Sequence, residues 1–411
     1  MPLPQIDSVA AKPKHAMPYN ARRRSRLATY VCIPLAVVVA VLVTYGLLVC
    51  WSATANDAKY SFTNQLAGVL GGLVLMAGTC AFDYRKFTGM YIVMLVVSCV
   101  LILSPHLPII GVNAMGAQSW VRIGVQIQPG EFAKVTIVLF AAGLVSRYGG
   151  KLGDVREYCK VVGLLLVPFL CIMTQPDLGT GLVYLFISAT TLVMGGARAK
   201  YLLVSLGVLV AAIAAVFALD ELLKYTTEDG EVEYRLLKQY QRSRLLVFLN
   251  QDSLESTDEG YNLKQAMIAI GSGGLLGKGL GASTQSALGF LPEAPTDFIF
   301  CVLAEELGFV GVVALLALYI AMIAISLRIA RDCGNLFGML VICAIVGMWM
   351  FQILENIGMC CGLMPITGIP LPFVSYGSSF MVVNFVMLGL IGSVYSHENR
   401  VGKGMKYATA R

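Results

Sequence analysis

Long apolar runs recur along the whole chain, and they restrict its fold more than any other feature. Each run is about 20 residues long, which is the length that a helix needs to cross roughly 30 Å of hydrocarbon. Hydrophobic residues make up 57% of the 411 residues and only 13% are charged, which leaves too little polar surface for a soluble protein of this length. The sequence therefore predicts an all-α, polytopic membrane protein.

The apolar runs predict ten transmembrane helices. They cover residues 27–53, 62–82, 87–104, 131–147, 161–175, 178–195, 201–219, 298–327, 335–357 and 376–395. Cytoplasmic loops of membrane proteins carry an excess of Lys and Arg. Here Arg85, Arg147 and Arg328 fall on the same side as the two basic ends of the chain. We therefore expect both termini to be cytoplasmic.

This orientation divides the chain into three parts. Residues 1–26 and 396–411 are predicted to be cytoplasmic tails, and residues 27–395 form the membrane domain. Residues 220–297, between the seventh and eighth spans, form a large extracytoplasmic loop, and loops of this size are usually functional. The shorter outer segment 105–130 contains a Trp and an Arg that suit the membrane interface.

Charge and cysteine patterns exclude two other classes of site. The net charge of +6 is spread over loops and ends of the chain, whereas a nucleic-acid partner would require a basic face. Most of the 11 cysteines lie inside apolar runs, and the three histidines are far apart. We therefore identify no metal-ligand set and no disulfide framework.

Asp297 lies where the polar 220–297 segment meets an apolar run. A carboxylate at such a boundary can remain ionised, accept a proton and reach a lipid-borne substrate, so Asp297 is a candidate functional residue. The structural alternative is that Thr296 or Asp297 caps the following helix. The two interpretations are compatible, because a capping carboxylate can also face a cavity.

Two further charged positions lie close to predicted spans. Glu131 and Lys134 are three residues apart and share one helix face, either as a structural pair or as the wall of a polar cavity that contacts phosphate or sugar. Asp177 lies in a break between two spans, where it caps the next helix or contacts a ligand.

The remaining candidates belong to the loop and to the spans after it. Arg242, Arg244, Lys264 and Lys278 supply cations outside the membrane, on a solvated surface or for diphosphate recognition. Glu305 and Glu306 point about 100° apart on a helix, so at most one shares the face of Asp297. A proton-relay role for them competes with a structural one, and Glu355 and Asn356 are equally candidates for structural partners.

Six sequence motifs, in order between residues 111 and 377, carry a family resemblance. They are Gly111-Val-Asn-Ala-Met-Gly-Ala-Gln-Ser-Trp120, Gln128-Pro-Gly-Glu-Phe-Ala-Lys134, Gln175-Pro-Asp-Leu-Gly-Thr180, Gly277-Lys-Gly-Leu-Gly281, Leu291-Pro-Glu-Ala-Pro-Thr-Asp-Phe-Ile-Phe300 with Glu305-Glu-Leu-Gly308, and Pro365-Ile-Thr-Gly-Ile-Pro-Leu-Pro-Phe-Val-Ser-Tyr-Gly377. Together they resemble the SEDS (shape, elongation, division and sporulation) family of peptidoglycan polymerases, which includes RodA, FtsW and SpoVE. Residues 113–118, 240–249 and 365–370 look more like RodA, whereas 279–283 leans toward FtsW.

The resemblance implies a peptidoglycan glycosyltransferase of the bacterial cytoplasmic membrane that polymerises lipid II. It implies that Asp297 is the general base, that the anomeric carbon is inverted, and that cations such as Lys134, Arg242 and Lys278 stabilise the departing diphosphate. The other implied substrate-binding residues are Trp120, Arg122, Glu131, Asp177, Glu293 and Glu306. Two positions depart from the family pattern: Gly130 stands in place of a Ser, and at Ser378 one Gly of the motif is either replaced or missing.

The resemblance also implies partners. These are a class B penicillin-binding protein and other elongation or division proteins. A divalent cation (Mg²⁺ or Mn²⁺) could assist the departing diphosphate, although no ligand set marks its place. The alternatives are a division or sporulation polymerase of the FtsW or SpoVE type, a flippase or transporter for a lipid-linked precursor, and a division scaffold without catalytic activity.

Overall fold

The computed structural model describes residues 31–408, apart from 56–58, 108–110, 115–116, 124, 176, 227–231, 234–243, 245–247 and 249–257. A helix lies at each of the ten predicted spans. They are α2 (Ile33–Thr54), α3 (Phe62–Ala81), α4 (Tyr91–Leu103), α5 (Pro129–Ser146), α6 (Val155–Ile172), α7 (Leu178–Met194), α8 (Ala199–Leu222), α12 (Ile299–Arg331), α13 (Leu336–Cys360) and α14 (Ser378–Ala408). Among the described residues, seven of these helices are long and apolar enough to cross a membrane, and α4 and α7 are shorter apolar helices.

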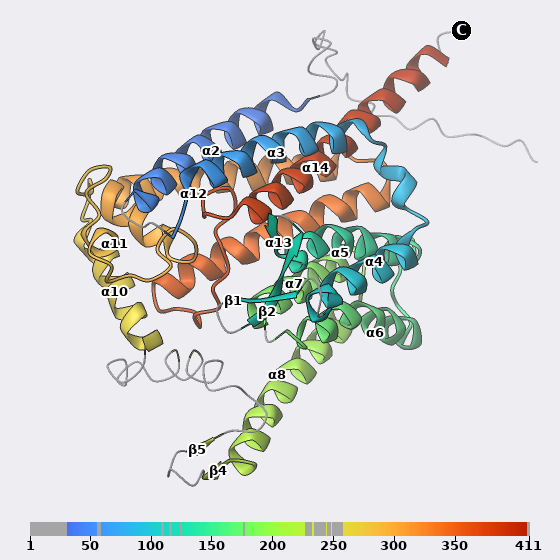
Figure 1. Ribbon diagram of the computed structural model, residues 1–411. Helices are drawn as coiled ribbons and strands as arrows, with labels where there is room; N and C mark the ends of the chain where they lie inside the picture. The colour runs from blue at the N-terminus through green and yellow to red at the C-terminus, as the bar shows by residue number, and fades with distance from the viewer. Residues whose placement is uncertain are drawn as a thin grey trace, which may run out of the picture.

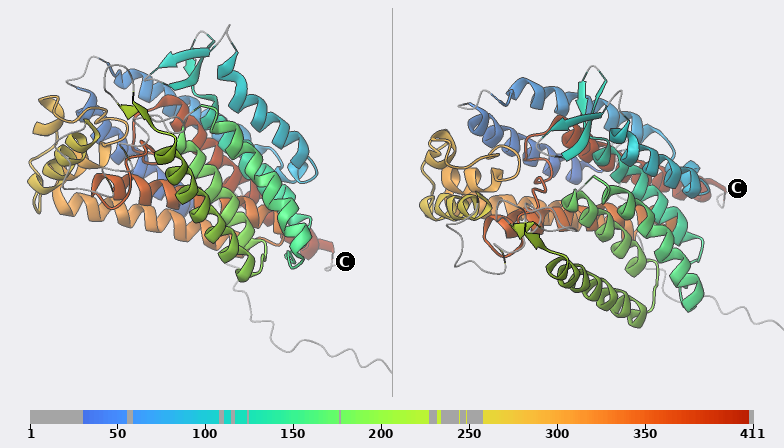
Figure 2. Two further views of the ribbon diagram at one scale, coloured as in Figure 1. Left: turned by 90° about the horizontal axis from the view of Figure 1, so that it is seen from below. Right: turned by 60° about the horizontal axis from the view of Figure 1, so that its bottom comes forward.

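The helices form a bundle around α13 (Figure 1). α13 is buried along most of its length and packs against α5, α7, α12 and α14. In contrast, α8 extends away from the other helices in Figures 1 and 2, and Asp220 is its only buried residue. An apolar helix that is exposed on all sides is stable only where lipid or another protein surrounds it.

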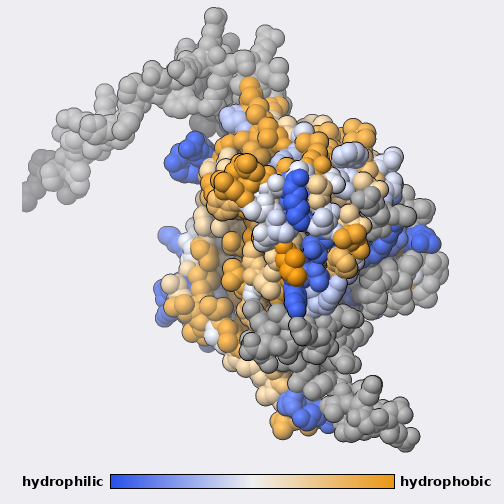
Figure 3. Space-filling model, turned by 90° about the vertical axis from the view of Figure 1, so that its left-hand side faces the viewer, coloured by the Kyte–Doolittle hydropathy of each residue, from blue (hydrophilic) through white to orange (hydrophobic). Residues whose placement is uncertain are grey.

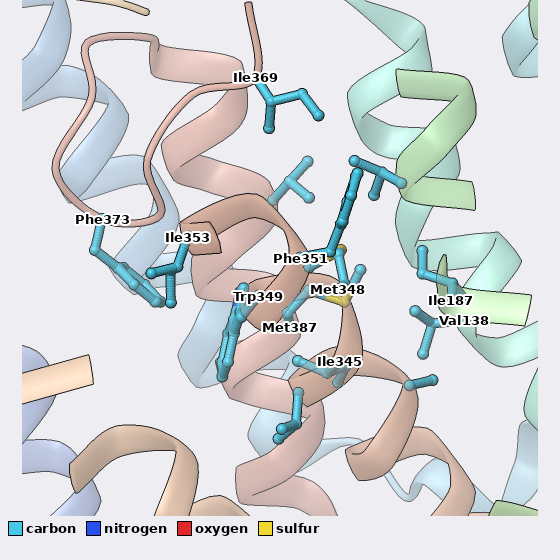
Figure 4. Close-up of a cluster of buried hydrophobic side chains, with 14 of the residues drawn as sticks. Val138, Ile187, Ile345, Met348, Trp349, Phe351, Ile353, Ile369, Phe373 and Met387 are labelled. Atoms are coloured by element: carbon cyan, nitrogen blue, oxygen red, sulfur yellow. The ribbon is translucent and has the colours of Figure 1, made fainter. Parts of the chain in front are cut away.

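The loop at residues 361–377, which connects α13 to α14, folds back onto the bundle core. In Figure 4, Phe373 of this loop lies beside the α13 side chains Ile353 and Trp349. Phe373 is fully buried, and its ring packs edge-on against Trp349 at a centroid distance of 5.6 Å. Such packing holds a connection without regular secondary structure in one conformation.

Two small sheets and two short helices were not expected from the sequence. The 105–130 segment contains the short helix η2 (Ser104–His106) and an antiparallel sheet of β1 (Gly111–Ala114), β2 (Ala117–Ile123) and β3 (Val125–Ile127), in the order β1-β2-β3. A second, two-stranded sheet of β4 (Tyr225–Thr226) and β5 (Val232–Glu233) follows α8. The short helix η1 (Tyr84–Phe87) joins α3 to α4.

α14 continues well beyond the apolar run that predicted it. The run ends near residue 395, but the helix ends at Ala408, so most of the predicted tail at 396–411 is helical. Hydropathy marks where a helix leaves the hydrocarbon and not where it ends, because polar residues are compatible with a helix in water. The predicted tail at 1–26 lies outside the described residues.

The later part of the 220–297 segment folds into α10 (Asp258–Ser272) and α11 (Thr284–Ala287) at one end of the bundle, opposite the end from which α14 projects (Figure 1). There the loop after α10 pairs with a break in α12 at Gly308, whose φ is 63°. The backbone N–H groups of Phe309 and Lys278 donate across this contact to Gly274 O at 2.9 Å and Glu305 O at 3.0 Å. The broken helix therefore keeps its backbone groups paired, as non-helical backbone near a membrane requires.

Candidate active site

Asp297 lies two residues before α12, at the end of the bundle that carries α10 and α11. Figure 3 looks onto this end, where hydrophilic side chains gather near the middle of the face and hydrophobic ones lie mainly beside them. α12 begins after Phe298, and no side chain caps it. The capping alternative for Asp297 is therefore wrong, and its carboxyl group is available for another role.

The 361–377 loop forms a wall against Asp297. Gly368 has a φ of +73°, and a Cβ placed there would lie 2.8 Å from Asp297 Oδ2. Only glycine allows both this backbone conformation and this close approach. The Asp297 carboxyl group therefore lies directly against the backbone of the loop.

Three hydrogen bonds fix the backbone of this wall and of Asp297 together. Asn356 Nδ2 on α13 donates to the backbone oxygens of Asp297 and Ile369, both at 2.8 Å. Ser375 Oγ donates to Thr296 O at 2.6 Å. Because Asn356 is fully buried, these bonds are shielded from water and hold Asp297 in one position.

The surroundings of Asp297 raise its pKa into the range that a general base needs. Desolvation, and next the neighbouring Glu293 carboxylate, raise the pKa of Asp297 to about 7, although Arg244 and Lys59 act in the opposite direction. A pKa near neutrality suits general-base catalysis at physiological pH. Arg244 Nη1 also donates to Thr367 O in the wall at 3.4 Å.

Glu293 has a different environment from Asp297, although both belong to one motif. Burial raises the pKa of Glu293, but hydrogen bonds from Lys59 and Tyr60 outweigh that effect and hold the pKa below its usual value. Both partners come from the short connection between α2 and α3. Glu293 therefore remains ionised at neutral pH while Asp297 can exchange a proton.

Glu305 is the centre of a separate polar cluster. It is fully buried and accepts hydrogen bonds from Lys278 Nζ at 2.5 Å, Ser283 Oγ at 2.7 Å and Thr284 Oγ1 at 2.6 Å. Glu306 is also buried and accepts a hydrogen bond from Ser52 of α2. These two carboxylates and Lys278 thus hold the α10–α11 loop against α12 and α2.

The Glu131–Lys134 pair forms as the sequence predicted. Lys134 Nζ lies 2.6 Å from Glu131 Oε1, and both side chains are almost completely buried.

Asp177 caps α7, because its carboxylate accepts hydrogen bonds from the Thr180 backbone N–H at 2.9 Å and from the Thr180 hydroxyl at 2.8 Å. This confirms the alternative in which Asp177 caps the helix that follows it.

The other candidates lie on the small sheet or outside the described residues. Trp120 is half-buried and Arg122 exposed on β2, which contacts α5, the helix of Glu131 and Lys134. Arg242 lies outside the described residues. Within the described part of the chain, no group of three or more His, Cys, Asp or Glu side chains could hold a metal ion.

Five contributors to the Asp297 site were not identified from sequence: Lys59, Tyr60, Thr367, Gly368 and Ser375. Lys59 gave a usable signal, because it is the only basic residue in an outer connection that is otherwise poor in charge. The others carry no charge at neutral pH, and only the folding of two distant connections brings them to Asp297.

Comparison with known proteins identifies the family. The model of the cell cycle proteins of the FtsW, RodA and SpoVE type matches residues 27–400. The chain belongs to the SEDS family. SEDS proteins are multi-pass proteins of the bacterial inner membrane, and this chain is a peptidoglycan glycosyltransferase.

Individual relatives are similar to this chain along most of its length. The peptidoglycan glycosyltransferase MrdB of Escherichia coli is 34% identical, covering 89% of this chain and 93% of its own. The stage V sporulation protein E of Bacillus subtilis is 32% identical, covering 88% and 95%. The peptidoglycan glycosyltransferase RodA of Treponema pallidum is 30% identical, covering 87% and 95%.

Solved structures share the fold. A chain from a peptidoglycan synthase complex that coordinates polymerization and crosslinking has a TM-score of 0.72 and 29% identity, covering 89% of this SEDS protein and 97% of that chain. The rod shape determining protein RodA of Thermus thermophilus has a TM-score of 0.63 and 28% identity, covering 89% and 96%. The fold is therefore RodA-like.

Proposed function

We propose that this SEDS protein polymerises lipid II into glycan strands for cell-wall elongation, with Asp297 as the general base. One observation carries the proposal: the Asp297 carboxyl group is held against the backbone wall of a polar site at one end of a membrane bundle. Desolvation there raises the pKa of Asp297 to about 7. Asp297 would take the proton from the acceptor sugar hydroxyl while that oxygen attacks the anomeric carbon of the donor. A single direct displacement inverts the configuration at that carbon.

The departing diphosphate needs positive charge. Arg244, which lies beside Asp297, and Arg242, two residues before it, are the cations that we assign first to this role. Lys134 and Lys278 are each bound to a glutamate, so a part for them would require those pairs to adjust. We assign Trp120, Arg122, Glu131, Asp177, Glu293 and Glu306 to the walls of the substrate path and its supports.

The membrane arrangement follows from the same proposal. In this arrangement ten spans lie within residues 27–395, and the tails at 1–26 and 396–411 are cytoplasmic. The 220–297 segment and Asp297 then lie on the outer side. A lipid-linked donor in the outer leaflet could then reach Asp297 without crossing the membrane. We propose a class B penicillin-binding protein as the partner, supported by the synthase complex in which a chain of this fold occurs.

Two alternatives remain as outcomes of the test. A division or sporulation role is supported by the sporulation protein, whose identity of 32% is close to the 34% of MrdB. A flippase would need a polar path through the bundle. The buried polar side chains of α5 and α13, among them Lys134 and Gln352, are the features that would favour it.

The experiment supplies labelled lipid II to the purified protein together with its penicillin-binding partner. We expect glycan polymer whose new linkages have the opposite anomeric configuration to the donor. If vesicles containing the complex move lipid II between leaflets and make no polymer, the protein is a transporter. Depletion in cells separates the two cell-wall roles, since loss of elongation gives round cells and loss of division gives filaments.

A further inference from the structure

Gln65, in the first turn of α3, is a buried amide that has no part in the reaction described above. Its side chain is only 1% exposed, and both of its polar atoms bond to the backbone of the 361–377 loop. Gln65 Nε2 donates to Ser375 O at 3.1 Å, and the backbone N–H of Gly377 donates to Gln65 Oε1 at 2.9 Å. One side chain thus bridges both ends of the 375–377 stretch.

These two hydrogen bonds explain why an amide can be buried at this position. A polar side chain inside a membrane bundle is costly unless its polar atoms are bonded. The loop has no regular secondary structure, so its backbone groups need partners from elsewhere. An apolar residue at position 65 would take this partner from both Ser375 O and the Gly377 N–H, at a cost of about 1–3 kcal/mol for each buried group.

The 375–377 stretch in turn holds the chain just before the proposed base. Ser375 Oγ donates to Thr296 O at 2.6 Å, and the backbone N–H of Tyr376 donates to Pro295 O at 2.9 Å. A continuous route of backbone and hydrogen bonds therefore leads from α3 through this stretch to the residues that precede Asp297.

Two further contacts hold α3 and the connection before it against the same end of the loop. The rings of Tyr60 and Tyr376 pack edge-to-face, with their centroids 5.0 Å apart. A Cβ at Gly68, about one turn after Gln65, would lie 2.7 Å from the Ser378 Cα. Small residues allow such close approach of backbones in membrane bundles, so α3 is a fixed support behind the 375–377 stretch.

We propose that Gln65 is a positioning residue for Asp297, which acts through the 375–377 stretch and not through contact with the substrate. This inference rests on the proposed role of Asp297 as base. Asn356 holds the Asp297 backbone from α13, whereas Gln65 holds the two preceding residues from α3. Both supports matter because a displacement of roughly 1 Å at a reacting group can lower the rate about 100-fold.

The test measures lipid II polymerisation by the complex of this protein with its partner. Gln65→Leu approximately keeps the volume of the side chain and removes both hydrogen bonds. We expect kcat to fall by about 10–100-fold, with KM for lipid II close to the wild-type value.

Asn384→Leu is the matched control, because it also removes a buried amide that bonds at both ends. Asn384 is 1% exposed, and its partners are Trp349 and Phe380 instead of the loop. We expect Asn384→Leu to lower the melting temperature and leave kcat close to wild type. A merely structural role for Gln65 would give the same pattern in Gln65→Leu.

A double variant tests the route through the loop. Ser375→Ala removes the hydrogen bond to Thr296 O, so we expect it to lower kcat by itself. Gln65→Leu combined with Ser375→Ala should lose little more rate than Gln65→Leu alone, because residues of one hydrogen-bond network do not act additively. Losses that multiply, or a wild-type kcat in Gln65→Leu, would overturn the proposal.

Folding and the proposed function are separated by two controls. If Gln65→Leu does not yield folded protein, Gln65→Met replaces it, and failure of both variants to fold would make Gln65 purely structural and refute the inference. Asp297→Asn is measured in parallel. If Asp297→Asn is inactive and Gln65→Leu has the wild-type kcat, only the positioning role fails; if Asp297→Asn is active, the proposed base itself is wrong.

Discussion

Asp297 can act as a base only if its carboxyl group exchanges a proton near the pH of its surroundings. Desolvation and the neighbouring Glu293 raise its pKa, and Arg244 and Lys59 limit the rise, so the value is about 7. Glu293 remains ionised because Lys59 and Tyr60 hold it. Two carboxylates four residues apart thus have different roles because their partners differ.

This pKa predicts how the wild-type rate depends on pH. Asp297 is protonated below its pKa and cannot accept the hydroxyl proton, so we expect the polymerisation rate to fall as the pH decreases through about 7. The fall should approach tenfold per pH unit. Lipid II binding, measured over the same range, should change little. A rate that stays constant down to pH 5 would contradict the assignment.

Gly368 gives a second prediction for a single residue. Gly368→Ala forces a Cβ towards Asp297 Oδ2 in a conformation that alanine rarely adopts, so we expect a rate loss of roughly 10–100-fold from the displaced base. Gly207→Ala is the control, because a Cβ there meets nothing within 4 Å. Equal rates for the two variants would show that the wall does not position Asp297.

At the scale of elements, the break in α12 determines how the α10–α11 loop docks. Gly273, Gly277 and Gly308 bring two backbones together so closely that a Cβ at any of them would overlap backbone atoms of the opposite segment. The buried Glu305 then binds the returning loop through Lys278, Ser283 and Thr284. Glu305 is only eight positions after Asp297 in the chain, so this docking also fixes the start of α12.

We therefore expect Gly277→Ala to destabilise the protein by about 1–3 kcal/mol or more. The φ of Gly277 is +80°, and the Cβ of an alanine there would overlap the Glu306 carbonyl group. Gly271→Ala, in α10 with open space around its Cα, should be neutral or slightly stabilising. Thermal unfolding in detergent measures both. Equal melting temperatures for Gly277→Ala and Gly271→Ala would mean that the loop does not dock as described.

The helices could be predicted from sequence, whereas most of their connections could not. Length and hydropathy are properties of consecutive residues, so the apolar runs located all ten helices. The three-stranded sheet was missed because β1 and β3 have only four and three residues, although Val121, Arg122 and Ile123 of β2 alternate as a strand does. Within the site, Asp297, Glu293, Arg244 and Asn356 were candidates from sequence. Gly368 and Thr367 were not, since they reach Asp297 through a long-range fold.

For the whole molecule, the decisive property is which side of the membrane each end of the bundle faces. The proposed orientation places the end with α10 and α11 outside the cell and the connection between α5 and α6 in the cytoplasm. Only that arrangement lets Asp297 meet a donor in the outer leaflet.

Cysteine labelling tests this orientation. In a protein whose native cysteines are replaced, Leu288→Cys should react with a membrane-impermeant maleimide in spheroplasts, because Leu288 is 66% exposed near α11. Lys151→Cys should react only after the membrane is permeabilised. Labelling of Lys151→Cys in intact spheroplasts would reverse the topology and remove Asp297 from the outer leaflet.

The most direct measurement is the polymerisation rate of Asp297→Asn in complex with the partner. Asparagine keeps the size of the side chain and loses the base, so we expect no detectable polymer, with lipid II binding and the melting temperature close to wild type. The loss should exceed 100-fold, the lower end of what a positioned general base contributes, about 10²–10⁴-fold. If Asp297→Asn polymerises lipid II at the wild-type rate, Asp297 is not the base of this enzyme.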